Sequence, residues 1–278
     1  MEELSNNKCF DGEQLRFSHK SSTVNCEMQF SVFLPPQAKE SSVPVLFWLS
    51  GLTCTDENFV FKAGAQKYAS KYGIAIIAPD TSPRGKGIPD DVEGAYDFGL
   101  GAGFYLNATE YPWNLNYQMH DYINNELTKL IEKEFPVNLD RCGIFGHSMG
   151  GHGALCIGLK NPKRFKAISA FAPICSPINC SWGKKAFKNY LGDDEDNWKN
   201  YDACELVLEN KAVQQPVLVD QGSDDEFLST QLKPELLEKA FNKAERSLQL
   251  RMQNGYDHSY FFIASFIQDH LRFHRDNL

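Results

Sequence analysis

The chain has 278 residues, of which 42% are hydrophobic and 23% are charged. This composition excludes a disordered, collagen-like or coiled-coil protein, and the length allows a core that needs no disulfide or structural metal. The 28 basic and 36 acidic side chains leave a net charge of −8, which argues against partners such as nucleic acid or an anionic membrane surface. No repeat or linker divides the sequence, so we expect a single domain over residues 1–278.

The sequence indicates neither an export signal at its start nor an apolar run of membrane-spanning length. The first residues, Met-Glu-Glu-Leu-Ser, lack the basic and apolar regions of a secretory signal. No apolar run approaches the roughly 20 residues that cross a bilayer. Eight cysteines occur and none forms a C-x-x-C pair. These observations predict a cytoplasmic protein with reduced thiols.

Strand and helix patterns alternate along most of the chain. Residues 24–34 alternate apolar and polar side chains, which is typical of a strand with one solvated face. Residues 43–49 form a continuous apolar run, as in a parallel strand covered on both faces. The alternation predicts an α/β fold with a mostly parallel sheet, antiparallel N-terminal strands and helices on both faces. The other predicted elements are helix 58–71, strand 74–78, a long loop over 81–115, helix 117–135, strand 142–146, helix 149–160, strand 165–171, helix 184–191, strand 216–220, helix 231–243, strand 248–252 and helix 259–274.

A G-x-S-x-G motif, Gly146-His-Ser-Met-Gly150, lies between a predicted strand and a predicted helix. In this context the serine occupies a sharp, strained turn, and the flanking glycines remove side chains that would collide with the neighbouring strand and helix. The pattern therefore predicts Ser148 as a nucleophile. The backbone N–H of Met149, at the start of the helix, is the first expected donor to an oxyanion.

A nucleophilic serine needs a base and an orienting carboxylate, which follow it in this order: acid, then histidine. Three aspartates, 220, 224 and 225, follow or end a late predicted strand. Asp225 is favoured because Gly222 turns the chain, with Asp224 as the alternative. His258 lies in a loop that enters the last helix, whereas His270 and His274 lie within that helix and should face the core or solvent.

The remaining features of the expected site are less specific. The second oxyanion donor is expected from the loop after strand 43–49, where the backbone N–H of Leu52 follows Gly51. His147 and His152 flank the nucleophile; we expect His147 to turn away from the site and both to be packing residues. No histidines have the spacing of a zinc site, so neither a metal nor another cofactor is expected.

Beyond these single motifs, the sequence resembles the S-formylglutathione hydrolase (esterase D) family from about residue 8 to its end. By position, Ser148, Asp225 and His258 correspond to the family's triad. The resemblance implies the α/β-hydrolase fold, a cytosolic homodimer, and hydrolysis of S-formylglutathione to glutathione and formate during formaldehyde detoxification, with side activity on simple esters. The motifs that carry it are Leu49-Ser-Gly-Leu-Thr-Cys-Thr-Asp-Glu-Asn-Phe59, Ala78-Pro-Asp-Thr-Ser-Pro-Arg-Gly85, the nucleophile motif through Leu155, Phe171-Ala-Pro-Ile-Cys-Ser-Pro177, Trp182-Gly-Lys-Lys-Ala-Phe187, Tyr190-Leu-Gly192, Asp220-Gln-Gly-Ser-Asp-Asp-Glu-Phe-Leu228 and Gly255-Tyr-Asp-His-Ser-Tyr260.

An anionic substrate would require local cations in a chain of charge −8. Two residues are further candidates for the pocket: Cys54, two positions after Leu52, and Trp182. Cys54 is either a small buried side chain or a thiol whose alkylation blocks the site, with a pKa lowered by the following helix. A general carboxylesterase or an acyltransferase acting on O-acyl groups is the alternative function.

Five cations lie in or beside the predicted loops near the site and could bind an anionic substrate. They are Lys62, Arg84, Lys86, Lys184 and Lys185, of which Arg84 and Lys86 are the pocket candidates.

Overall fold

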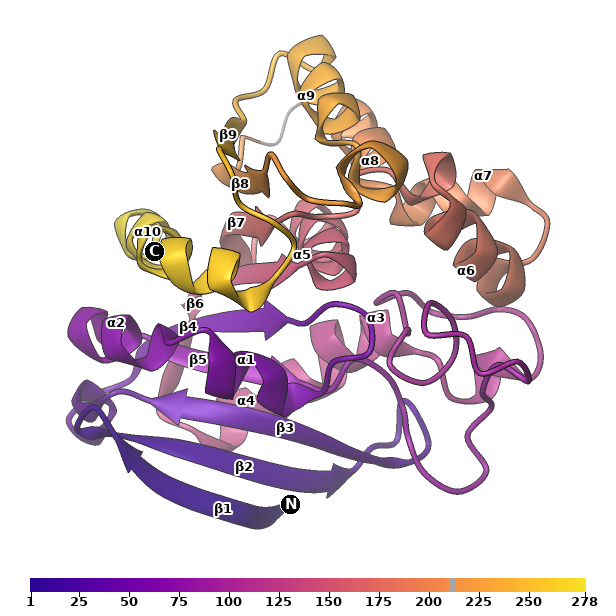
Figure 1. Ribbon diagram of the computed structural model, residues 1–278. Helices are drawn as coiled ribbons and strands as arrows, with labels where there is room; N and C mark the ends of the chain where they lie inside the picture. The colour runs from indigo at the N-terminus through magenta and orange to yellow at the C-terminus, as the bar shows by residue number, and fades with distance from the viewer. Residues whose placement is uncertain (211–213) are drawn as a thin grey trace.

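One mixed β-sheet organises the molecule, which a computed structural model describes over residues 1–210 and 214–278. Within these residues nine strands follow the order β1-β2-β3-β5-β4-β6-β7-β8-β9. The pairings among β5, β4, β6, β7, β8 and β9 are parallel, and the three pairings that involve β1, β2 and β3 are antiparallel. The antiparallel strands, which come first in the chain, lie together at one edge of the sheet (Figure 1). The strands are β1 Glu2–Cys9, β2 Gly12–Lys20, β3 Glu27–Leu34, β4 Val43–Leu49, β5 Ala75–Pro79, β6 Val137–His147, β7 Phe165–Phe171, β8 Val217–Gly222 and β9 Gln249–Gln253.

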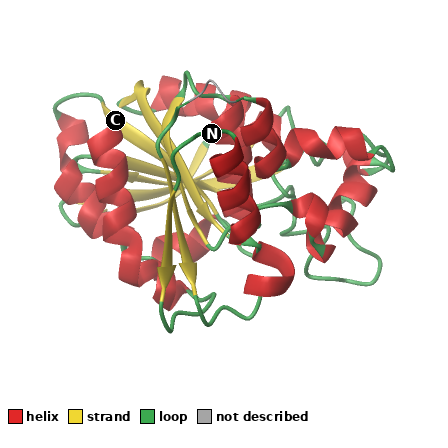
Figure 2. Cartoon of the chain, turned by 90° about the horizontal axis from the view of Figure 1, so that it is seen from above, coloured by secondary structure: helices red, strands yellow, loops and turns green. Residues whose placement is uncertain are grey.

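Helices cover both faces of this sheet (Figure 2). Helix α10 packs against α2 and β7, whereas α5 packs against β6, β7 and α8. The predicted α/β architecture with antiparallel N-terminal strands is therefore confirmed. The helices are α1 Asp56–Lys62, α2 Ala65–Tyr72, α3 Met119–Asp121, α4 Thr128–Glu134, α5 Met149–Lys160, α6 Ser181–Leu191, α7 Glu195–Trp198, α8 Ala203–Glu209, α9 Pro234–Lys243 and α10 Tyr260–Asn277, with π-helical turns at Tyr122–Leu127 and Leu228–Leu232.

The core is densest around the central parallel strands. The ring of Trp48 on β4 stacks on Phe59 of α1 with centroids 4.0 Å apart, and Phe145 on β6 meets it edge-on at 4.8 Å. Every residue of α5 except Lys160 is buried. A helix that is buried all round holds its first residue in place through packing on every side.

The structure divides or interrupts three of the predicted helices. Helix 58–71 is two helices, α1 and α2, because Gly64 takes the left-handed conformation at φ +67°. Helix 117–135 contains a π-helical turn, Tyr122–Leu127, and the Thr128 hydroxyl that follows it donates a hydrogen bond to the Ile123 carbonyl. Helix 231–243 begins at Pro234, because Lys233 has φ +51° and ends the preceding π-helical turn. These interruptions depend on single backbone conformations that hydrophobic periodicity does not report.

Candidate active site

The nucleophile turn joins β6 to α5. Ser148 has φ +57° and ψ −121°, a conformation that is strained for a residue with a side chain. Its backbone N–H donates to the Phe171 carbonyl on the adjacent β7 at 3.0 Å. A β-carbon at Gly146 or Gly150 would collide with backbone oxygen atoms of Gly150 or Leu49, respectively. The two glycines are therefore needed for the turn to pass this close to β4.

The expected acid and base lie in loops at the carboxyl ends of β8 and β9. Nδ1 of His258 is 2.6 Å from Oδ2 of Asp225, whose side chain has 0% exposure, against 16% for the histidine. The Asp225 carboxylate also accepts from Gln221 Nε2 and from the Phe227 backbone N–H. Asp224 is exposed and accepts a hydrogen bond from Ser223. Asp225, and not Asp224, is thus the partner of the histidine.

Ser148 and His258 line one cavity of about 340 Å³. Its wall comes from the loop after β4, the start of α10, α6 and the loop at Tyr96, so segments far apart in the sequence meet at the carboxyl edge of the parallel strands. Cys54 and Trp182, which were predicted as pocket residues, are part of it. The lining residues are Gly51, Leu52, Thr53, Cys54, Asn58, Lys62, Tyr96, His147, Ser148, Trp182, Phe227, His258, Ser259 and Tyr260.

Two backbone amides beside Ser148 are free to bind an oxyanion. Gly51 packs against the nucleophile, because a β-carbon there would lie 3.1 Å from Ser148 Cβ. The N–H groups of Leu52 and Met149 have no hydrogen-bond acceptor within residues 1–210 and 214–278. Unpaired amides at a helix N-terminus and an adjacent loop are what an oxyanion hole requires.

The structure corrects the prediction for His147. Its side chain does not turn away from the site: it lines the cavity, and its ring lies 4.4 Å from that of His258. Burial, together with the nearby His258, lowers the pKa of His147 well below its ordinary value. The β9–α10 loop folds back over the end of β6, and this long-range contact is what brings the two imidazoles together. His147 is consequently a neutral ring that supports one side of His258.

Two predicted cations are not pocket residues. Arg84 is paired with Asp80, with Nε at 2.9 Å from Oδ2, and its Nη2 donates to the Cys54 carbonyl. Lys86 is exposed and does not line the cavity. The cation that does line it is Lys62, the last residue of α1.

Cys54 also differs from expectation in its acidity. Burial raises the pKa of the Cys54 thiol, against opposing effects of the Tyr260 hydroxyl and Lys62. The expected lowering by the helix that follows is therefore wrong. Desolvation of the thiolate outweighs the dipole of a helix only seven residues long.

The two late histidines lie in the core, as predicted. His270 Nδ1 lies 2.8 Å from Ser169 Oγ, and its Nε2 lies 3.3 Å from Oδ2 of Asp220. His274 Nε2 lies 2.9 Å from the same serine oxygen. All four side chains are fully buried. They form a hydrogen-bonded network between the sheet and α10, and none of them lines the cavity.

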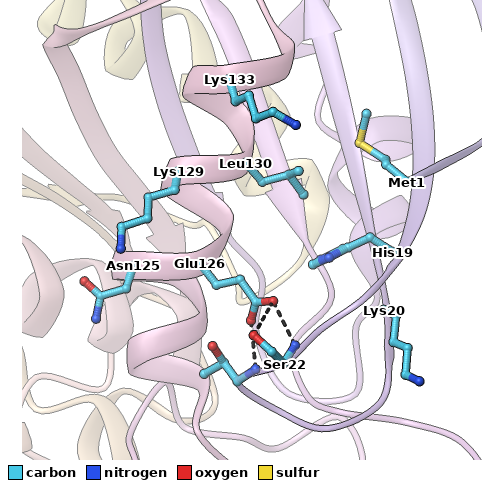
Figure 3. A pocket seen from close by; sticks show the side chains of 10 residues that line it. Met1, His19, Lys20, Ser22, Asn125, Glu126, Lys129, Leu130 and Lys133 are labelled. Carbon is cyan, nitrogen blue, oxygen red and sulfur yellow. Dashed lines mark hydrogen bonds between the residues drawn. The ribbon is translucent and has the colours of Figure 1, made fainter.

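A larger cavity of about 640 Å³ opens elsewhere, between β2 and the helix at 122–134 (Figure 3). Its carboxylate, Glu126, accepts hydrogen bonds from Ser21, Ser22 and Thr23, which lower its pKa to about 2 despite partial burial. A carboxylate saturated in this way holds the β2–β3 loop in place. This cavity contains no serine near a histidine–aspartate pair.

Metal centres and membrane-spanning helices are two further features that a functional site could require. Within residues 1–210 and 214–278, no group of three histidine, cysteine or acidic side chains could hold a metal ion. In the same residues no helix has the length and apolarity to cross a membrane.

A strained serine between a parallel strand and a helix, beside a histidine–aspartate pair and two open amides, defines the class: serine hydrolases with the α/β-hydrolase fold. The family model "Esterase: Putative esterase" matches residues 21–273. S-formylglutathione hydrolases of Rattus norvegicus and Mus musculus are 53% and 54% identical over 275 residues, covering 99% of this chain and 97% of each relative. The solved structure of an S-formylglutathione hydrolase from Agrobacterium tumefaciens has a TM-score of 0.97 at 47% identity and covers 100% of both chains. The chain belongs to the S-formylglutathione hydrolase family of esterases.

Proposed function

We propose that this protein hydrolyses the thioester S-formylglutathione to glutathione and formate. The observation that carries the proposal is the identity of more than half of the chain, over nearly its full length, with relatives of that name. The cavity adds chemical support, because a serine, a histidine paired with an aspartate, and two open amides surround it.

In the proposed mechanism, Ser148 Oγ attacks the formyl carbon while His258 Nε2 takes the hydroxyl proton. Asp225 holds the imidazole in the required tautomer through its contact with Nδ1. The negative charge on the formyl oxygen is stabilised by the Leu52 and Met149 N–H groups. Such donors act most strongly where the charge develops in the transition state.

The tetrahedral intermediate then collapses and expels the glutathione thiolate. A thiol with a pKa of about 8.5 is a good leaving group, so the C–S bond can break before the sulfur is protonated. The protonated His258 then gives its proton to the departing thiolate, which leaves as the glutathione thiol, and the imidazole is again a neutral base. Water, deprotonated by His258, attacks the formyl-enzyme, and cleavage of the ester releases formate and restores the Ser148 hydroxyl. The same acyl-enzyme route supports side activity on simple carboxylic esters, which share the carbonyl chemistry.

We further propose the cellular setting. All eight cysteines are free thiols, which supports a cytoplasmic location. A role in formaldehyde detoxification is proposed from the family resemblance. We propose one catalytic domain over residues 1–278, since strands from both ends of the chain share one sheet. A homodimer is proposed from the family resemblance alone.

Steady-state kinetics on S-formylglutathione and on an aryl acetate test the proposal. We expect kcat/KM for the thioester to exceed that for the ester by at least about a hundredfold. A comparable or higher value for the oxygen ester would support the alternative, a general carboxylesterase. Transfer of the acyl group to an added alcohol in place of water would instead identify an acyltransferase.

A further inference from the structure

One cationic side chain, apart from histidine, lines the catalytic cavity within the part of the chain that the structure describes. This is Lys62, which ends α1 and whose Nζ lies 5.5 Å from the centroid of the Tyr260 ring. Its charge also acts on the Cys54 thiol, where it opposes the effect of burial. The ammonium therefore lies at the mouth of the cavity that holds Ser148.

Lys62 differs from the neighbouring cations because no carboxylate neutralises it. Among residues 1–210 and 214–278, Lys62 has no ion-pair partner within 4.0 Å. Arg84, by contrast, is paired with Asp80, and Lys185 with Asp97 at 2.7 Å. Arg16 is paired with Asp56 and Glu57. In a chain of net charge −8, an unpaired cation at this place favours an anionic ligand.

A second donor lies one helical turn earlier on the same side of α1. Asn58 also lines the cavity, and positions i and i+4 share a helix face. Its Oδ1 accepts from the Thr55 backbone N–H at 2.9 Å in the helix cap. The Nδ2 group has no acceptor in the described residues, so it remains available to a ligand. Asn58 and Lys62 together offer an amide and an ammonium to one carboxylate.

Three exposed carboxylates adjoin the acid and the base of the site in the sequence. Asp224 and Glu226 flank Asp225 in the sequence, and Asp257 precedes His258; all three side chains are exposed. None of the three is paired with a lysine or arginine in the part of the chain that the structure describes. These carboxylates add negative charge next to Asp225 and His258, whereas Lys62 supplies the positive charge in the cavity lining, which favours an anionic group at α1.

We propose that Lys62 and Asn58 bind a carboxylate of the thiol leaving group of the substrate. The proposal rests on the proposed function, because glutathione supplies two carboxylates and an aryl acetate supplies none. Since the carboxylate lies away from the reacting carbonyl, the contact is equally strong before and in the transition state. Such uniform binding lowers KM and leaves kcat unchanged.

The test compares Lys62→Ala with Lys86→Ala, a matched exposed lysine outside the cavity. With S-formylglutathione at low ionic strength, we expect Lys62→Ala to raise KM about tenfold with kcat within twofold, and Lys86→Ala to change neither. KM for the aryl acetate, which has no carboxylate, should change much less than KM for S-formylglutathione in Lys62→Ala. Lys62→Arg should recover most of the lost affinity, and added salt should raise KM for the wild type more than for Lys62→Ala.

Asn58→Asp provides a second arm, because its carboxylate can still accept from Thr55 and preserve the cap. It removes the Nδ2 donor and adds a negative charge, so we expect KM for S-formylglutathione to rise at least as much as in Lys62→Ala. Circular dichroism would show that α1 is intact. An unchanged KM in Lys62→Ala and Asn58→Asp, or an equal rise for both substrates, would overturn the proposal.

A third arm separates this proposal from the proposed function. S-methylglutathione carries the same carboxylates but has no bond to cleave, so it reports binding alone, as an inhibitor of aryl acetate hydrolysis. Its inhibition constant should rise about tenfold in Lys62→Ala. A wild type without thioesterase activity would refute the proposed function, and the inhibition constants would still decide the carboxylate site.

Discussion

Within residues 1–210 and 214–278, two clusters combine a serine, a histidine and an aspartate, and one of them borders the cavity of about 340 Å³. Ser148, with His258 and Asp225, lies at the carboxyl edge of the sheet. Ser169, His270 and Asp220 are linked by hydrogen bonds of 2.8 and 3.3 Å and are fully buried. By residue type and contact, the buried cluster matches a triad at least as closely as the first.

The two clusters differ in backbone conformation and in charge compensation. Ser148 has a positive φ at a strand–helix turn, whereas Ser169 lies within the extended strand β7. Asp220 is held by Arg251, with Nη2 at 2.5 Å from Oδ2, whereas Asp225 has no arginine or lysine partner in the described residues. A catalytic serine is therefore distinguished by access to a cavity, a strained turn and open amides. Hydrogen bonds among serine, histidine and aspartate do not suffice, because the buried cluster has them too.

Replacing the serine of each cluster should give the largest difference in activity between the two clusters. Ser148→Ala should lower kcat/KM by roughly 10⁴-fold or more while the protein stays folded, because the nucleophile is lost. Ser169→Ala should keep its activity but lose about 1–3 kcal/mol of stability, since two buried imidazoles lose their partner. Kinetics and urea unfolding measure both effects. A fluorophosphonate probe should label Ser148 only, and labelling at Ser169 would reverse the assignment.

The aspartates provide the next largest contrast. Asp225→Asn should lower kcat by about 10²- to 10⁴-fold, because the histidine tautomer is no longer held. Asp224→Asn, the exposed neighbour, should change kcat less than threefold. Asp220→Asn should instead lower the free energy of unfolding by about 3 kcal/mol through the loss of a buried ion-pair partner. A larger activity loss in Asp224→Asn than in Asp225→Asn would move the acid to position 224.

The buried cluster should also determine part of the pH dependence of stability. Burial, with a smaller effect of His270, lowers the pKa of His274 from about 6.5 to about 3. Between these values the unfolded chain binds a proton that the folded chain does not, so stability is complete above pH 6.5 and falls as the pH falls. At pH 5 this costs about 2 kcal/mol relative to pH 7.

Urea unfolding at pH 7 and pH 5 measures this effect. His274→Phe and the smaller His274→Leu remove the titrating group, so each should lose less stability than the wild type between the two pH values. An equal loss in the wild type and both variants would show that His274 does not carry the dependence.

The smallest effect is expected at Cys54. Cys54→Ser should retain most activity, because the thiol lines the cavity and is not the nucleophile. Its raised pKa predicts slow inactivation of the wild type by a maleimide, faster at higher pH, with protection by substrate. Equal sensitivity of Cys54→Ser would assign the inactivation to another cysteine. Cys9 and Cys26 are the other partly exposed thiols.

The sequence was most informative where a continuous apolar run met a clear break. Strands 43–49 and 165–171 and helix 149–160 have the predicted bounds. Strand β1 was not predicted, because nearly all of its side chains are exposed and its sequence, EELSNNKC, has no apolar period. An edge strand of this kind forms through backbone pairing with β2, which leaves little trace in residue type.

The candidate site likewise combines residues that the sequence predicts with contacts that it does not. The motif around Ser148 and the order of acid and base are local signals, so they could be predicted from the sequence. The contact of His147 with His258, and the pairing of Arg84 with Asp80, join segments whose approach depends on the whole fold. Among the cavity residues that were not predicted, Tyr96 lies in an irregular segment without a motif, and Phe227 lies in the Asp220–Leu228 motif, in which only the aspartates were considered for the site.

The burial of α5 from Met149 to Leu159 has a consequence for local opening. Its amide hydrogens are expected to exchange with solvent only through global unfolding, whereas the irregular segment 84–97, which has no buried residue, is expected to open at lower free energy. The nucleophile is therefore attached to the last part of the molecule to open, and Tyr96 in the cavity wall to one of the first. In mild denaturant, recognition of a large substrate should fail while the serine still reacts with small probes.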